Sequence, residues 1–217
     1  MDIEACRRSH GWFMEWFMDP VFKGVYPQFL VDWFAQKGAQ LDIQAGDMEL
    51  IAEPIDILGI NYHIGTVARF KENQGLFDCE HVDIGYDRTD IGFKIYPDGF
   101  YKVLVDIKNK YGDIPIFITE NGACYNDEPV DGRVQDDKRI RYYQQHLTEL
   151  SRAIQSGVNI KGYCTWSLLD NFEWAFGYTK RFGLVHVNYN TLERTKKDSY
   201  YWLKSSRKII GLKCETN

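Results

Sequence analysis

Four apolar runs alternate with helical stretches along the chain, and this alternation constrains the fold more than any other feature. The runs cover Pro54–Tyr62, Ile114–Asn121, Asn159–Leu169 and Arg181–Tyr189. Near-continuous apolar runs are typical of parallel strands that are covered on both faces. Repeated strand–helix units predict right-handed βαβ crossovers. Four such units fit either an open doubly wound sheet or half of an eight-stranded barrel.

The helical stretches between and around these runs have conventional start and stop signals, such as proline in a first turn and glycine after a last one. The predicted helices cover Tyr26–Gly38, Pro97–Gly112, Asp136–Gly157 and Asp198–Ile210. Residues 68–97 lack periodicity and are predicted as an elaborate loop with a small hairpin. In βα folds such loops lie at the carboxyl ends of the strands, where ligands bind.

Charge and cysteine content exclude several classes of protein. The net charge of −5 is spread evenly with no basic stripe, which argues against nucleic acid as a partner. No apolar run is long enough to cross a membrane, and the first residues do not resemble a signal peptide. The five cysteines are an odd number without CxxC spacing, which argues against a disulfide framework or a zinc site. A reducing cytoplasm is the expected location.

One apolar run ends on a carboxylate, in the sequence IFITENG. Glu120 follows the run directly, so it is expected at the carboxyl end of a strand, which is a catalytic position in βα folds. A capping or loop carboxylate is the alternative. Asn121 would orient a substrate group, and Gly122 would let the backbone turn tightly.

A second polar and aromatic block, WSLLDNFEWAFGYTKRFGL, follows the next run. In a functional interpretation Trp166 and Trp174 face a sugar ring while Glu173 accepts hydrogen bonds from its hydroxyl groups. The alternative is a set of core aromatics with a capped turn. Aromatic residues make up 15% of the chain, which suits sugar recognition and equally suits a dense core.

Several motifs occur in the order found in one enzyme family. These motifs are DPVFKGVYP, GINY, ITENG, WSLLDNFEW and GYTKRFGL, followed by ERTKKDSYYW with Lys196 where a proline is usual. From about residue 4 to its end, the chain resembles glycoside hydrolase family 1, the β-glucosidase family.

The resemblance implies an eight-stranded TIM (β/α) barrel that hydrolyses β-glycosides with retention, using two carboxylates about 5–5.5 Å apart. It makes Glu120 the nucleophile and implies no metal or organic cofactor. Asn61 resembles a polar residue near the scissile bond. The residues that resemble the lining of the glycone subsite are Trp166, Glu173, Trp174 and Phe182.

Two further features refine this expectation. The Glu173 carboxylate would repel a phosphate, which favours unphosphorylated glucosides or galactosides. Many relatives have a tyrosine that hydrogen-bonds the nucleophile at the position of His63. Either Tyr62 takes over this tuning role or His63 becomes the donor, with a charge that depends on pH.

The acid/base motif of the family, Thr-x-Asn-Glu-Pro, is missing. The most similar stretch is Glu53-Pro54, which lacks the asparagine. It precedes the first predicted strand, whereas the family glutamate follows the carboxyl end of a strand. We therefore expect residues 1–217 to be one partial domain, the carboxyl-terminal half of the barrel with strands five to eight. Such a half leaves two strand edges unpaired and an apolar face uncovered.

An uncovered barrel half needs a partner, which would be the missing amino-terminal half or a second copy of the chain. The expected function is that of a retaining β-glucosidase that has little activity without the missing half. The alternative is a non-catalytic module that binds sugar or assembles with itself.

Overall fold

The computed structural model describes residues 1–206, which form two compact units. Unit 1 contains residues Met1–Asp56 and Thr66–Gly85, and unit 2 contains Ile57–Gly65 and the residues from Tyr86 onward. The last four residues of the predicted helix Asp198–Ile210 lie outside the described residues, as does Cys214. The interpretation of the chain as one partial domain stays a prediction.

Unit 1 is built from helices and one hairpin. Its elements are α1 (Asp2–Phe13), α2 (Glu15–Lys23), α3 (Gln28–Gln36), α4 (Asp47–Ile51), β2 (Val67–Phe70) and β3 (Cys79–Val82). The antiparallel pairing of β2 with β3 confirms the small hairpin, and α3 confirms the helix predicted after Pro27. The helices α1 and α2 were not expected from the sequence. Trp12 joins the elements of unit 1 through ring contacts with Phe34 and Phe77.

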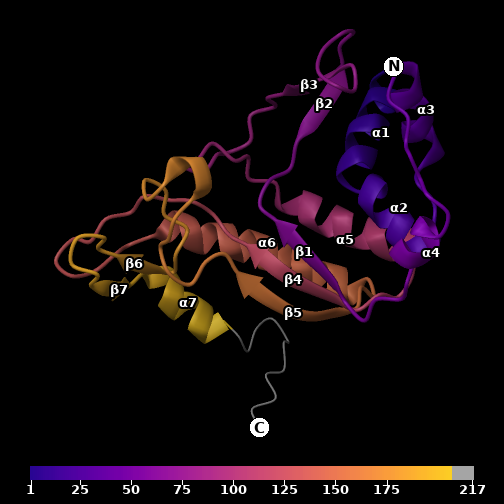
Figure 1. Cartoon of the computed structure of the whole chain (residues 1–217). Coiled ribbons are helices and arrows are strands. Elements are labelled where there is room, and N and C mark those ends of the chain that lie inside the picture. The colour runs from indigo at the N-terminus through magenta and orange to yellow at the C-terminus, as the bar shows by residue number, and fades with distance from the viewer. Residues whose placement is uncertain (207–217) are drawn as a thin grey trace. The chain divides into compact units, whose positions relative to one another are not determined.

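A parallel sheet forms the centre of unit 2. Its strands are β1 (Leu58–Tyr62), β4 (Ile116–Asn121) and β5 (Ile160–Thr165), in the order β1-β4-β5 (Figure 1). All pairings between them are parallel, as the apolar runs predict. Glu120 lies near the carboxyl end of the middle strand, between two neighbours.

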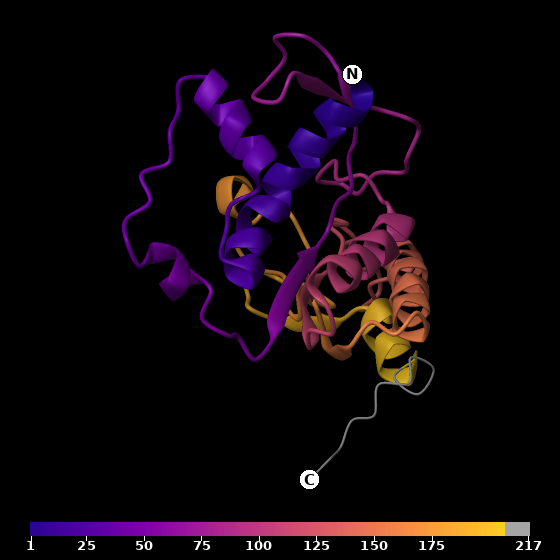
Figure 2. The same cartoon turned by 90° about the vertical axis from the view of Figure 1, so that its right-hand side faces the viewer.

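Two helices cover one face of this sheet. They are α5 (Pro97–Tyr111) and α6 (Asp137–Gln155), which run alongside the strands in Figures 1 and 2. The ring of Tyr62 stacks on Phe100 of α5 with centroids 4.8 Å apart. The Asn121 side chain donates to Tyr142 Oη of α6 over 3.1 Å. The helix α7 (Asp198–Ser206) packs against α6.

The other face of the sheet is open in unit 2. Its exposed residues come from all three strands and are Gly59, Asn61, Thr119 and Cys164. Asn61 and Thr119 are tied across this face by a hydrogen bond of 2.6 Å from Thr119 Oγ1 to Asn61 Oδ1. The strands β1 and β5 are the two edges of the sheet within residues 1–206.

The expectation of four parallel strands is wrong at Arg181–Tyr189. Within this run, β6 (Val185–Val187) pairs antiparallel with β7 (Arg194–Lys196), and an isolated parallel bridge joins Val185 to Leu169. The turn of this hairpin is held by Asn188, whose side-chain oxygen accepts from the backbone N–H of Asn190 over 3.0 Å. The run is buried as predicted, but a local turn, not a crossover, provides its partner.

No helix in the described part of the chain is long and apolar enough to cross a membrane.

Candidate active site

Glu120 lies where the open face meets the carboxyl end of β4. Its side chain is 31% exposed, and its Oε2 lies 3.1 Å from His63 Nε2. In the register of the sheet, Glu120 is opposite Asn61 of β1. The carboxylate is therefore held on a rigid element and reachable from solvent, as a nucleophile requires.

His63, and not Tyr62, is the residue that contacts Glu120. The other ring nitrogen of His63, Nδ1, lies 3.0 Å from the carbonyl oxygen of Gly122. Tyr62 instead donates its hydroxyl hydrogen to the carbonyl oxygen of Tyr96 over 2.6 Å. Burial raises the pKa of Tyr62 far above its usual range, with smaller contributions from Tyr96. Of the two residues predicted to tune Glu120, His63 is therefore the one that contacts it. Tyr62 lies on the face of the sheet that α5 covers.

Glu173 brings a second carboxylate to the same place. Burial raises its pKa, and the nearby charge of Glu120 adds to this rise. His63 and a hydrogen bond from the Trp166 side chain act in the opposite direction. His63, Trp166 and Glu120 all influence the pKa of Glu173, so these three residues lie near it. All four residues were singled out in the sequence.

Asn121 does not orient a substrate group, contrary to expectation. Its side chain is fully buried and donates to the carbonyl oxygen of Tyr62 over 2.7 Å. Its Oδ1 accepts from Tyr163 Oη over 2.7 Å. These bonds tie β4 to β1 and β5 directly behind Glu120, so Asn121 fixes the backbone that carries the carboxylate.

Gly122 is required by a close approach between two strand ends. A Cβ atom at this position would lie 1.8 Å from the carbonyl oxygen of Trp166. The backbone N–H of Trp166 also donates to the carbonyl oxygen of Asn121 over 2.9 Å. Only glycine lets the segments carrying Glu120 and Trp166 come this close.

The two remaining predicted subsite residues differ in burial. Phe182 is buried, and its ring lies edge-on to His63 with centroids 6.1 Å apart. Trp174 begins the short 3-10 turn Trp174–Phe176, directly after Glu173, and is 82% exposed. Phe182 therefore packs against His63 from the buried side, while the Trp174 indole is presented to solvent.

Comparison with known proteins decides the family. The sequence profile of Glycosyl hydrolase family 1 matches residues 1–211. This chain belongs to glycosyl hydrolase family 1. The family 1 structures that it matches imply a TIM (β/α) barrel fold family, of which the chain matches about half.

Several relatives of this family 1 chain are named β-glucosidases, and the chain covers about half of their length. It is 44% identical over 213 residues to Beta-glucosidase A of Acetivibrio thermocellus, covering 97% of this chain and 48% of that protein. The GH1 beta-glucosidase structure from Exiguobacterium antarcticum B7 superposes with a TM-score of 0.90 at 40% identity, covering 96% of this chain and 47% of the other. The family 1 β-glucosidase of Thermotoga maritima gives a TM-score of 0.89 at 39% identity, covering 98% and 47%. The chain thus spans about half the length of the relatives it matches.

A buried carboxylate, which the sequence did not single out for this role, holds the loop between β5 and β6 of this family 1 chain. Both oxygens of Asp170 are used: Oδ1 contacts Lys197 Nζ over 3.0 Å, and Oδ2 contacts Arg181 Nη1 over 2.8 Å. The backbone N–H of Gly183 also donates to Oδ1 over 2.9 Å. Burial lowers the pKa of Lys197 to about 8. The loop that carries Glu173 is thereby anchored at its base.

A buried guanidinium plays the same role for the loop after β4. Arg139 of α6 is fully buried and donates to Asp136 over 2.9 Å and to the carbonyl oxygen of Tyr125 over 2.9 Å. It also donates to the carbonyl oxygens of Ala123 and Phe182. It therefore connects the segment after Glu120 with the segment around Phe182. The only sequence signal for it was an acidic residue three positions earlier.

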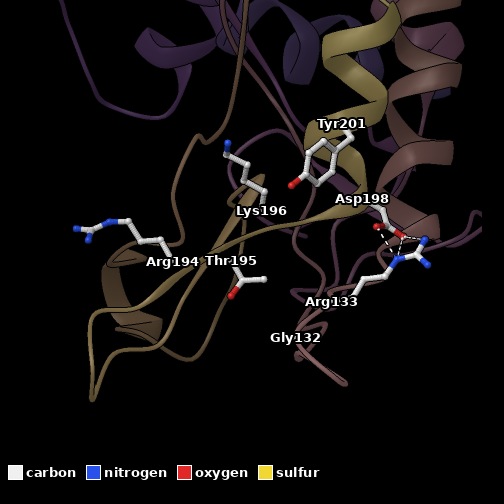
Figure 3. Close-up of a pocket in the computed structure, with 7 residues that line it drawn as sticks. All are labelled: Gly132, Arg133, Arg194, Thr195, Lys196, Asp198 and Tyr201. Atoms are coloured by element: carbon white, nitrogen blue, oxygen red, sulfur yellow. Dashed lines mark hydrogen bonds and ion pairs between the residues drawn. The ribbon is translucent and has the colours of Figure 1, made fainter.

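An open hollow of about 470 Å³ lies elsewhere in unit 2, near the start of α7. Figure 3 shows its lining residues, which are Gly132, Arg133, Arg194, Thr195, Lys196, Asp198 and Tyr201. Arg133 is engaged with Asp198 over 2.8 Å, and the side chains of Arg194 and Lys196 point away from Arg133. None of the predicted site residues lines this hollow. The side chains of Arg133, Arg194 and Lys196 do not converge on a common point that could bind an anion.

Glu53, which precedes a proline as the acid/base glutamate of the family does, is exposed and follows α4 in unit 1.

Among residues 1–206, no group of three or more His, Cys, Asp or Glu side chains is arranged to hold a metal ion. Cys6, Cys79, Cys124 and Cys164 are free thiols.

Proposed function

We propose that this chain supplies the nucleophile and the glycone subsite of a retaining β-glucosidase. The observation that carries the proposal is Glu120 itself, a partly exposed carboxylate at the end of a central strand, hydrogen-bonded by His63 and close to Glu173. The names of the relatives, which are β-glucosidases, support the same reaction.

Each residue has a role in this proposal. The contact with His63 fixes Oε2 of Glu120, so that Oε1 attacks the anomeric carbon. The bond to the aglycone oxygen breaks as the glycosyl-enzyme forms, and an acid/base residue from the missing half protonates that oxygen. Water then hydrolyses the glycosyl-enzyme and releases the sugar. Glu173, held by Trp166, accepts hydrogen bonds from sugar hydroxyl groups. The Trp174 indole packs on the apolar face of the sugar, and Phe182 closes the far wall. Asn61, whose Oδ1 is occupied by Thr119, directs its amide N–H groups toward the substrate.

The charge of the site favours neutral substrates. Glu120 and Glu173 place two carboxylates near one imidazole, so a phosphorylated sugar would meet net repulsion. We therefore propose unphosphorylated β-glucosides or β-galactosides as substrates.

The proposed enzyme needs a second part of a barrel, because the acid/base motif of the family is missing from this sequence. We propose that the chain is the carboxyl-terminal half, on the strength of its motif order, and that it contributes three parallel strands, not four. The open face with Asn61 and Thr119, and the edges β1 and β5, are where the amino-terminal half or a second copy would complete the sheet. A reducing cytoplasm suits the four free thiols found within residues 1–206.

The test is complementation. The chain is mixed with the amino-terminal half of a family 1 β-glucosidase, and hydrolysis of an aryl β-glucoside is followed. We expect turnover in the mixture and a rate at least about 10²–10⁴-fold lower for the chain alone, because it lacks acid/base assistance.

Two variants make the complementation test specific. Glu120→Gln removes the nucleophile with little change in shape and is expected to abolish turnover. Glu193→Gln, at an exposed carboxylate next to β7, is the matched control and is expected to retain turnover. A folded mixture without turnover contradicts the proposal, and stabilisation by glucose without turnover would instead favour the non-catalytic sugar-binding module.

A further inference from the structure

Both ring nitrogens of His63 face hydrogen-bond acceptors. Nδ1 lies 3.0 Å from the carbonyl oxygen of Gly122, and a carbonyl oxygen only accepts, so Nδ1 carries a hydrogen. Nε2 lies 3.1 Å from Oε2 of Glu120, and an ionised carboxylate also only accepts. A neutral imidazole has one N–H group and cannot serve both contacts.

We propose that His63 is a doubly protonated imidazolium at neutral pH, so that His63 and Glu120 together carry no net charge. The alternative location of the second proton, on Glu120, is disfavoured because a carboxylic acid is in general a stronger acid than an imidazolium ion. Glu120 therefore stays an anion and accepts a charge-assisted hydrogen bond from Nε2.

The surroundings of His63 favour a cation. The loop after β5 brings the second carboxylate, Glu173, whose pKa responds to His63. From α6 comes another imidazole, His146, but burial lowers its pKa to about 4 and keeps it neutral. The Phe182 ring presents its edge, and the His63 side chain is only 17% exposed. The groups that contact His63 or act on it electrostatically are thus two carboxylates, one neutral imidazole and an aromatic ring.

The consequence for catalysis rests on the proposed function. A protonated His63 is a positioning residue that holds Oε2 of Glu120 while Oε1 reacts. When His63 loses its Nε2 proton at higher pH, the lone pair of Nε2 faces the Glu120 carboxylate. The hydrogen bond that positions Oε2 is then lost. A tyrosine hydroxyl keeps its hydrogen until about pH 10. His63 therefore adds an alkaline limb to the pH profile that a tyrosine would not produce.

Nitrogen NMR of the ¹⁵N-labelled chain at neutral pH tests the proton assignment directly and needs no activity. We expect both His63 nitrogens at the imidazolium position in the wild type. In Glu120→Gln we expect a neutral ring with hydrogen on Nδ1 only, because the amide of the new side chain can donate to Nε2. The exposed His81 of unit 1 is the internal reference, and its signals are expected to stay unchanged. A neutral His63 ring in the wild type, in either tautomer, overturns the proposal.

The pH dependence of the complemented enzyme supplies the second readout. The acid/base residue of the amino-terminal half gives every complemented enzyme one alkaline limb in kcat/KM. We expect kcat/KM to fall more steeply with rising pH in the wild type than in His63→Tyr, because only the wild type also loses the His63 proton. Alkaline limbs of the same steepness in the two enzymes contradict the positioning role. If complementation gives no turnover at all, the proposed function fails, while the NMR experiment still decides the protonation of His63.

Discussion

His146 makes unit 2 sensitive to acid, and the structure gives the size of the effect. Its Nδ1 donates to the carbonyl oxygen of Tyr142 over 2.8 Å, and its ring stacks on the Tyr142 ring with centroids 3.9 Å apart. Its Nε2 is buried and has no hydrogen-bond partner among the described residues. Protonation would therefore create a buried, unsatisfied N–H group with a positive charge, which is why burial lowers the pKa of His146 to about 4.

The sign of the effect follows from proton binding. In the unfolded chain this histidine binds a proton below about pH 6.5, whereas in the folded chain it stays neutral until about pH 4. Stability is therefore lost as the pH falls through this window. The difference of about 2.5 units corresponds to about 3 kcal/mol at most, since one unit is about 1.4 kcal/mol.

Urea unfolding between pH 7 and pH 4 measures this loss. His146→Leu is expected to lower stability at pH 7, because packing and the bond to Tyr142 are lost. Its stability should nevertheless fall less steeply with acid, by about 3 kcal/mol over the window. His81→Gln, at an exposed histidine, is the control and should keep the wild-type slope. Parallel wild-type and His146→Leu curves would refute the reasoning.

Two further predictions concern the supports of the site, both measured by urea unfolding. Gly122→Ala is expected to lower the free energy of unfolding by about 3 kcal/mol, because its Cβ would lie 1.8 Å from the Trp166 carbonyl oxygen. Gly59→Ala is the control, since its Cβ would lie 3.1 Å from a methyl group of Thr119. It should lower the free energy of unfolding by less than about 1 kcal/mol. Equal costs would contradict the close approach. Asp170→Ala is expected to cost about 3–5 kcal/mol because it leaves the Lys197 ammonium buried and unpaired, and adding Lys197→Met should restore part of this loss. A double variant no more stable than the single one would count against this explanation.

The sequence predicted the sheet well where an apolar run lies between two helices. The strands β1, β4 and β5 and the helices α5 and α6 follow from apolar periodicity and from capping signals. The sequence missed α1 and α2, because Gly11 lies within the first and Pro20 within the second, and both residues normally disfavour a helix interior.

The fourth run shows why burial alone does not determine pairing. Val185–Val187 is buried as expected, yet the local turn at Asn188 gives it an antiparallel partner. An apolar run predicts that a strand is covered, but only the connection that follows predicts its neighbour.

The candidate site residues were predicted from their positions at strand ends, but the contacts of single side chains depend on their direction. Successive residues of a strand point to opposite faces, so Asn61 and His63 share a face and Tyr62 takes the other. This alternation was a usable signal for His63. The burial of Asn121 gave no comparable signal, because β4 is irregular between Ile118 and Asn121 and simple alternation fails there.

Covalent labelling of the complemented enzyme with a 2-fluoro β-glucoside tests the central claim most directly. Peptide mass spectrometry is expected to find the glycosyl adduct on the peptide that contains Glu120, and Glu120→Gln is expected to remove it. An adduct on another residue, or turnover that persists in Glu120→Gln, would contradict the assignment of Glu120 as the nucleophile.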